Sequence, residues 1–231
     1  MAAEGDDIIR FIFTGEDGEV VPADATHVTV HESVKVIPSR AFLRHRNILE
    51  FECHDGVEKV EEALKAIEYS NVTTVQIIFN LFRQRPSELF FSEAKKKDIG
   101  IIARVPLASG LLTGKFDAKT TFDAQDHRNF NRNGDAFDKG ETFSGIDYNL
   151  GLKAVEELKA LFPESKNLAA IALQWILSFN EVSCIIPGAS KVSHVLSNLS
   201  VYDSPKLTNE QILGMNKIYN DLIKPSVHQL W

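Results

Sequence analysis

Apolar and polar residues follow two different periods in the first quarter of the chain and in the rest of it. In the first part, residues 8–13 and 27–31 alternate with a period of two around a Gly/Asp turn at 15–18. This pattern predicts a β-hairpin. Further along, apolar residues recur at i, i+3, i+4 and i+7, which indicates amphipathic helices, and β-branched runs lie between them. The chain is therefore expected to have a β-rich segment, residues 1–56, followed by an α/β domain, residues 57–231.

Helical and strand patterns take turns throughout the second part, and this order predicts parallel βαβ units. One polar segment, residues 117–149, interrupts the alternation. A loop of that length is usually functional or disordered. We expect strands at 73–79, 99–105 and 182–186, and helices at 60–67, 87–97, 152–161, 168–179, 192–199 and 209–222.

The first part contains a weak internal repeat. HESV at 31–34 matches HDGV at 54–57, and residues 47–53 match residues 71–77. The stretch around 34–54 resembles one repeat of the BspA-like leucine-rich repeats. A solenoid needs about three repeats to bury its faces, and fewer than two are present. A small structural appendage is therefore the alternative to a functional repeat array.

Two segments carry the strongest chemical signal: IIARVPLASGLLTGK at 101–115 and CIIPGASK at 184–191. Each is an apolar, β-branched run that ends in a turn rich in Pro and Gly. Such a run is typical of a buried parallel strand. The turn would present backbone N–H groups and a lysine to a ligand at the carboxyl end of the strand.

These segments occur in order with VEEALKAI at 60–67, VQIIFN at 75–80 and ALQWIL at 172–177. In that order they resemble the second half of an aldo-keto reductase, over residues 57–231. The resemblance implies a partial (β/α)₈ TIM barrel of about four strands, with residues 49–57 standing in for one of them. It also implies NADP(H) as cofactor and a small carbonyl compound as substrate.

The resemblance assigns the nicotinamide end of the cofactor to Gln76 and Phe79. An amide side chain suits the carboxamide, and a flat aromatic face suits the ring. The alternative is a polar strand residue followed by a core phenylalanine.

The loop that would fold over the pyrophosphate follows the strand at 99–105. Exposed N–H groups at such a turn can bind anions. The family commonly has Ser where this chain has Val105, so a guanidinium would have to replace a hydroxyl. The resemblance implies cofactor contact for Arg104, Pro106, Leu107, Ser109, Gly110, Leu112 and Lys115.

The segment that would bind the adenosine 2′-phosphate and the adenine follows the strand at 182–186. Glycine permits close approach, serine and lysine supply a donor and a charge, and two further polar residues lie one helical turn apart. These residues are Gly188, Ser190, Lys191, His194 and Asn198. The family more often has Arg or Lys at the Ser190 position, which leaves the choice between NAD and NADP open.

The family's catalytic tetrad of Asp, Tyr, Lys and His has no recognisable counterpart. Residues 1–53 contain no tyrosine, so no proton donor to the carbonyl can be named. We therefore predict no catalytic residues and an impaired enzyme. The alternative is an interaction or assembly protein that uses the repeat-like N-terminus and the exposed sheet of a partial barrel, for example as a homo-oligomer.

Composition narrows the remaining classes. A net charge of −7 without a basic run speaks against nucleic acid, and no apolar run is long enough for a membrane span. Cys53 and Cys184 lack zinc or disulfide spacing. We expect a cytoplasmic protein without a metal site. The triplet Asp126, His127 and Arg128 is interpreted as loop hydrogen bonding.

Overall fold

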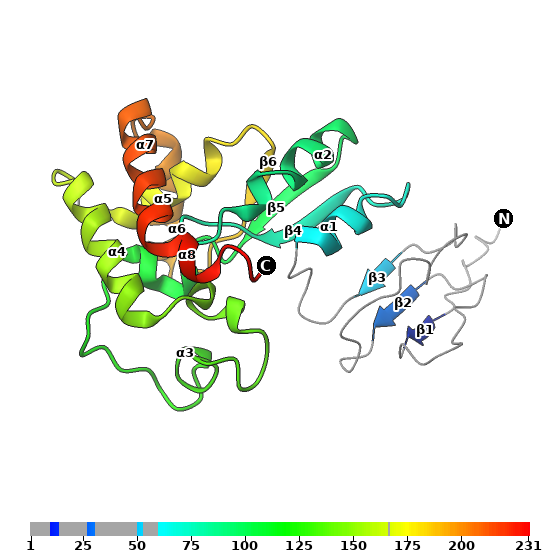
Figure 1. Ribbon diagram of the computed structural model, residues 1–231, viewed down its shortest axis with the longest axis horizontal. Helices are drawn as coiled ribbons and strands as arrows, with labels where there is room; N and C mark the ends of the chain where they lie inside the picture. The colour runs from blue at the N-terminus through cyan, green and yellow to red at the C-terminus, as the bar shows by residue number, and fades with distance from the viewer. Residues whose placement is uncertain (1–9, 14–26, 31–49, 53–59, 166) are drawn as a thin grey trace. The chain divides into compact units, whose positions relative to one another are not determined.

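The computed structural model describes residues 10–13, 27–30, 50–52, 60–165 and 167–231 (Figure 1). The chain divides into two compact units, residues 1–57 and 58–231, and each is described by itself.

The first unit contains one three-stranded sheet in the order β1-β2-β3. Its strands are β1 (Arg10–Phe13), β2 (His27–Val30) and β3 (Glu50–Glu52), and both pairs are parallel. The predicted hairpin is therefore wrong, because hairpin strands are antiparallel. Parallel neighbours need a long connection, which here is residues 14–26. The leucine-rich repeat rests mainly on residues outside the described ones and stays a prediction.

The second unit is built on a parallel three-stranded sheet in the order β4-β5-β6. The strands are β4 (Thr74–Ile78), β5 (Gly100–Arg104) and β6 (Val182–Ile185), which confirms the three strands expected here. The fourth strand expected at 49–57 is not part of this sheet, because β3 pairs with β2 instead. The fold is of the α/β class.

The helices lie along the chain where they were expected, but two of them are each split into two elements. The expected helix at 87–97 becomes a 3₁₀ turn at Pro86 and then α2, and the expected helix at 209–222 ends in a π turn. The elements are α1 (Val60–Ala66), η1 (Arg85–Ser87), α2 (Phe90–Lys96), η2 (Ala108–Thr113), α3 (His127–Phe130), η3 (Lys139–Glu141), η4 (Phe143–Gly145), α4 (Tyr148–Leu161), α5 (Leu168–Leu177), α6 (Val192–Leu199), η5 (Ser200–Asp203), α7 (Asn209–Ile218), η6 (Tyr219–Ile223) and α8 (Lys224–Val227).

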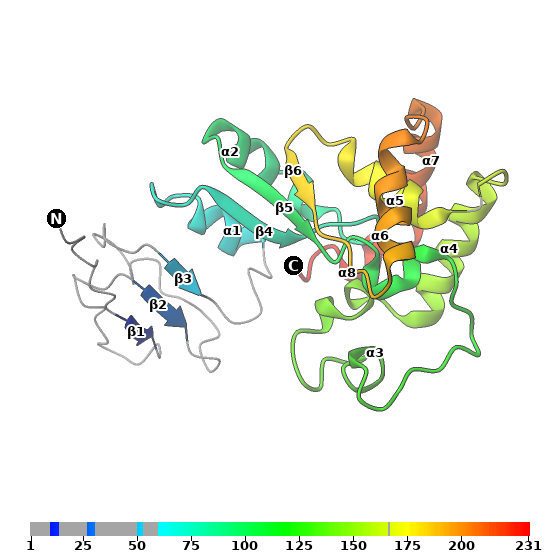
Figure 2. The same cartoon turned by 180° about the vertical axis from the view of Figure 1, so that it is seen from behind.

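The core lies between one face of the sheet and the helices. Alternate strand residues such as Val75, Ile77 and Ile101 are 5% exposed or less. Helices α1, α2 and α5 contact β4, β5 and β6 respectively (Figure 2). An aromatic cluster lies against α5. The ring centroid of Phe79 lies 5.2 Å from that of Trp175, in a stacked pair, and 4.7 Å from that of Phe91, in a tilted pair. Such contacts add to the free energy gained by burial.

The segment between η2 and α4 makes a wide excursion that carries α3 (Figure 1). Cationic and aromatic side chains hold it. The Phe122 ring lies 4.6 Å from the Arg128 guanidinium and 5.7 Å from that of Arg132, and the Tyr148 hydroxyl donates to the carbonyl of Asp117 at 3.0 Å. The expected long loop is thus an ordered structure with its own contacts.

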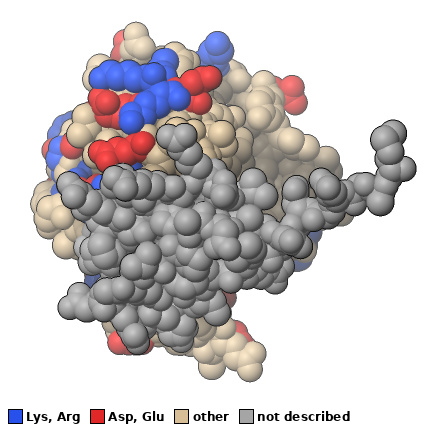
Figure 3. Space-filling model, turned by 90° about the vertical axis from the view of Figure 1, so that its right-hand side faces the viewer, with Lys and Arg blue, Asp and Glu red and all other residues tan. Residues whose placement is uncertain are grey.

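Two surface properties of the described residues bear on function. None of the helices in the described ranges is long and apolar enough to cross a membrane. On the coloured part of the face in Figure 3, basic and acidic side chains are intermingled rather than gathered into one basic surface.

The packing of Phe79 yields a stability prediction. Its ring is fully buried, so Phe79→Ala should lower the free energy of unfolding by about 3–5 kcal/mol, and Phe79→Leu by about 1 kcal/mol. Phe130→Ala, at a ring that is 42% exposed, is the control and should cost less than about 0.5 kcal/mol. Urea unfolding measures all three. Equal, small losses at both positions would contradict a core role for Phe79.

Candidate functional site

The candidate site lies where the carboxyl ends of β4, β5 and β6 meet. The backbone N–H of Phe79 donates to the carbonyl of Arg104 at 3.4 Å, and that of Ile186 to the carbonyl of Ala103 at 3.1 Å. The three segments that follow the strands therefore begin side by side. Ligands of parallel α/β proteins bind at this end of the strands.

Two loops at this edge have strained backbones. Of the six non-glycine residues with positive φ among those described, five lie here, namely Val105, Ala108, Ser109, Phe143 and Ser144, with φ between 47° and 58°. For a β-branched residue such as Val105 this conformation is a genuine outlier. Each costs on the order of 1–3 kcal/mol and persists only where surrounding contacts enforce it.

Asn80 supplies the central contact. Its side chain is fully buried. The amide nitrogen donates to the carbonyl of Val105 at 2.9 Å and lies 2.8 Å from the hydroxyl of Ser144. The amide oxygen accepts from the N–H of Phe82 at 2.8 Å. One side chain thus joins the end of β4 to both strained loops.

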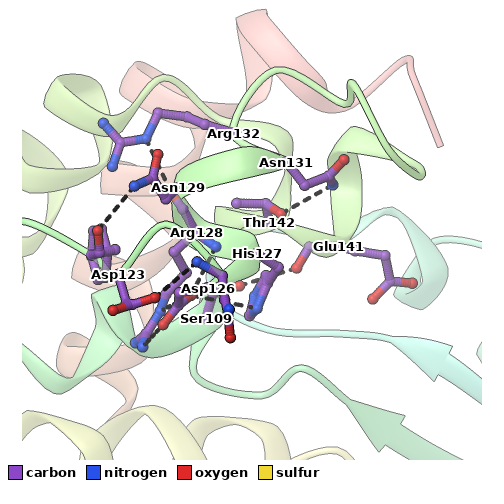
Figure 4. Close-up of polar contacts among 12 residues, drawn as sticks. Ser109, Asp123, Asp126, His127, Arg128, Asn129, Asn131, Arg132, Glu141 and Thr142 are labelled. Carbon is purple, nitrogen blue, oxygen red and sulfur yellow. Dashed lines mark hydrogen bonds and ion pairs between the residues drawn. The ribbon is translucent and has the colours of Figure 1, made fainter.

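Ser109 makes the second link between the loops. Its hydroxyl donates to the carbonyl of Glu141 at 3.0 Å and accepts from the N–H of Phe143 at 3.1 Å (Figure 4). The Ser109 hydroxyl is therefore committed to the neighbouring loop.

Arg104 and Glu141 form an ion pair across the same junction, with side chains 11% and 15% exposed. Removing one partner of such a pair is costly, because the other charge stays buried. In the structure the Arg104 guanidinium is engaged with Glu141, and its contact with a cofactor phosphate stays a prediction. Arg104 braces the loop that contains Glu141.

Several predicted cofactor residues belong to the core. Phe79 and Leu112 are fully buried and Pro106 is buried, so the core interpretation of Phe79, rather than ring stacking, fits its packing. Gln76 lies on the opposite face of β4 and is exposed, level with Ile102 on β5. Of the other predicted residues on this loop, Leu107 and Gly110 are partly exposed and Lys115 is exposed.

The segment after β6 is the most open of the three. Gly188, Ser190 and Lys191 are exposed, and a Cβ placed on Gly188 would meet no atom within 4 Å. Lys191 caps α6 with extended backbone and no side-chain bond to the helix. His194 and Asn198 lie one turn apart on α6, and both the backbone N–H and the hydroxyl of Ser190 are 3.4 Å from His194 Nδ1.

Loop hydrogen bonding is confirmed for the triplet at 126–128. The Asp126 carboxylate caps α3 by accepting from the backbone N–H of Arg128 at 2.9 Å, and it also accepts from the Arg128 side chain. Hydrogen bonding from Arg128 lowers the pKa of Asp126 to about 2. In the described part of the chain, no cluster of His, Cys, Asp and Glu has the arrangement of a metal site.

Sequence reasoning missed Asn80, Glu141 and Ser144, which organise the site. Asn80 follows directly on an apolar strand, a position where a polar side chain reaches the ligand edge, and this signal could have been used. Glu141 and Ser144 lie in a polar segment without periodicity, so no pattern distinguished them from their neighbours.

Comparison with known proteins identifies the family to which this fold and edge belong. The family model for "Aldo/keto reductase family" matches residues 52–220. The chain belongs to the aldo/keto reductase family.

Individual relatives agree with this assignment. The chain is 28% identical over 149 residues to the uncharacterized oxidoreductase YqkF of Bacillus subtilis, covering 64% of this chain and 44% of that protein. It is 26% identical over 119 residues to L-glyceraldehyde 3-phosphate reductase of Escherichia coli K12, covering 52% and 33%. It thus spans less than half the length of each of these two relatives.

A solved structure shares the fold. The glycerol dehydrogenase AKR11B4 of Gluconobacter oxydans superposes with a TM-score of 0.57 at 22% identity, covering 87% of this chain and 60% of that one. This likeness supports the α/β fold of the family.

Replacing Asn80 should loosen both loops. Asn80→Ala leaves the carbonyl of Val105 and the N–H of Phe82 without their buried partner, so the free energy of unfolding should fall by about 1–3 kcal/mol. Asn129→Ala removes one exposed amide bond to the carbonyl of Phe122 and should cost less than about 1 kcal/mol. Chemical denaturation compares them, and equal losses would argue against the central role of Asn80.

Asp126 should show its lowered pKa in the pH dependence of stability. A carboxyl with a folded pKa of about 2 against an ordinary 3.8 stabilises the fold above about pH 4, and this contribution disappears as the pH falls towards 2. The difference in Tm between wild type and Asp126→Asn should be constant from pH 7 to 5 and shrink below 4. A difference that does not change with pH would contradict this assignment.

Proposed function

We propose that this aldo/keto reductase binds NADP(H) at the carboxyl edge of β4, β5 and β6, and that its inherited reaction is the reduction of small aldehydes or ketones. The observation that carries the proposal is the open segment after β6. There a helix starts at an exposed lysine, a glycine has free space above it, and the segment follows β6, the neighbour of β5 in the sheet.

The chemistry of this edge suits the parts of the cofactor. Lys191 offers a positive charge to the 2′-phosphate, and the first turn of α6 adds its N–H groups. At Gly110 the Phe116 ring lies 2.9 Å from where a Cβ would be, so a pyrophosphate would meet this turn through its partly exposed residues such as Leu107. Gln76, exposed on the face of β4 opposite Phe79, can bind the nicotinamide carboxamide through both its donor and its acceptor.

We further propose that the reduction step is impaired. Hydride passes from the nicotinamide to the carbonyl carbon, and the oxygen must receive a proton from a general acid. Among the tyrosines, Tyr148 donates its hydroxyl to the carbonyl of Asp117 and is 8% exposed. Tyr219 is 4% exposed, and burial raises its pKa to about 12. Neither is suited to donate a proton to a substrate. Of the other two, Tyr69 lies in the turn before β4, at the opposite end of that strand from the candidate site, and Tyr202 lies in η5, which contacts α5 and α6.

A titration with NADPH tests cofactor binding. The purified chain should bind NADPH saturably in the micromolar range, followed by quenching of tryptophan emission. Lys191→Ala should weaken binding by about tenfold, since one charge-assisted bond to phosphate contributes about 1.5 kcal/mol or more. Lys206→Ala, at another exposed lysine, should leave the dissociation constant unchanged. Absence of saturable binding would refute the proposal.

Assembly through a second copy is the alternative function, favoured by one observation. Val192, Val195, Leu196 and Leu199 on α6 are between 46% and 76% exposed. Their spacing makes one apolar stripe along α6, the helix that follows β6, an edge strand of the sheet. A second copy matches this face, because an antiparallel pair of α6 helices would bury the same stripe twice.

The oligomeric state distinguishes the alternative. Wild type should associate with increasing concentration in light scattering, and Leu196→Glu should shift it to monomer, while Leu213→Glu, at an exposed residue of α7, should not. A wild-type chain that is monomeric at all concentrations would eliminate assembly through α6.

A further inference from the structure

Trp231 is packed against Arg83, Asp138, Gly140 and Gly145, which together form what we call the Trp231 socket. The residue is 6% exposed. Its indole N–H donates to the Asp138 carboxylate, at 2.9 Å from Oδ1, and the guanidinium of Arg83 lies over its ring at 4.4 Å. The hydrogen bond from the indole N–H and the guanidinium over the ring face together fix the indole in one orientation.

Two glycines shape the socket. A Cβ on Gly145, whose φ is +78°, would lie 2.2 Å from the indole ring. A Cβ on Gly140 would lie 2.8 Å from the ring and 2.2 Å from the Arg83 guanidinium. No other residue fits at either position without displacing the ring. The segment 138–145 is therefore built around this indole.

The same segment holds the first strained loop. Glu141 pairs with Arg104, and the carbonyl of Glu141 and the N–H of Phe143 both bond Ser109. Movement of this segment would therefore release the contacts that impose positive φ on the loop after β5.

The other wall of the socket belongs to the turn after β4. Arg83 and Asn80 exchange two backbone bonds, of 2.9 and 3.2 Å. Asn80 in turn bonds the carbonyl of Val105. Trp231 thus lies between the two segments that hold the strained loop, and it contacts both.

We propose that Trp231 is a positioning residue for the loop at Val105–Gly110. Its indole clamps segment 138–145 against the turn at 80–83 and so keeps the loop in its ligand-ready conformation. The inference rests on the proposed function only in that NADPH is the ligand of this loop. The adenosine segment at Gly188–Asn198 makes none of these contacts and lies outside the effect.

Two ligands separate this role from a general loss of structure. Trp231→Ala should weaken NADPH binding by about tenfold. It should leave the affinity for 2′,5′-ADP, which carries only the adenosine phosphates, within about twofold of wild type, since that fragment needs Lys191 and not the loop. Lys191→Ala should weaken both ligands. Leu230→Ala, at an exposed neighbour, is the control and should change neither.

Trp231→Phe is the conservative variant. It keeps a ring under Arg83 but lacks the N–H that bonds Asp138, so it should restore NADPH affinity to within about threefold of wild type. If Trp231→Ala unfolds the chain, Trp231→Phe still tests the proposal. A loss of NADPH affinity in Trp231→Phe as large as that in Lys191→Ala would contradict the positioning role of Trp231.

Hydrogen exchange without any ligand tests the clamp separately. Trp231→Ala should speed exchange at 105–110 and 138–145 and leave β4 and α5 unchanged. Unchanged exchange in both segments would overturn the inference. A wild-type chain that does not bind NADPH would refute the proposed function, and the exchange result would still decide the role of Trp231.

Discussion

The site depends on the buried amide of Asn80. Its nitrogen and oxygen bond a carbonyl, an N–H and a hydroxyl from three segments that are far apart in sequence. Left-handed backbone at five non-glycine residues is unfavourable unless such contacts hold it. The strained loops can therefore keep their shape only while this network is intact, which makes the geometry of the ligand edge a property of the tertiary structure.

The network also explains which residues are free to serve a ligand. Ser109 and Arg104 look like binding groups in the sequence, yet both are engaged with the segment 141–143. In the structure both hold the loop, whereas Gly188, Ser190 and Lys191 after β6 are exposed. Binding by a rigid backbone needs little reorganisation when a ligand arrives.

Much of the α/β unit could be predicted from sequence because its signals are local. The β-branched runs predicted β4, β5 and β6, and the 3.6-residue period predicted α1 and α4 to α7. The two-residue alternation of β1 and β2 could not show whether these strands pair parallel or antiparallel, because the pattern is the same in both cases. Phe79 could not be assigned because a core ring and a stacking ring have the same sequence signal. The socket of Trp231 was invisible, since Gly140 and Gly145 are explained only by a ring more than eighty residues away.

We propose that the carboxyl edge of β4, β5 and β6 is a nicotinamide cofactor site. A crystal structure of the chain grown with NADP⁺ tests it most directly. We predict density for the 2′-phosphate beside Lys191 and for the pyrophosphate against the backbone at Val105–Gly110, with both strained loops unchanged. An ordered cofactor bound elsewhere, or an empty edge in crystals saturated with NADP⁺, would contradict the account.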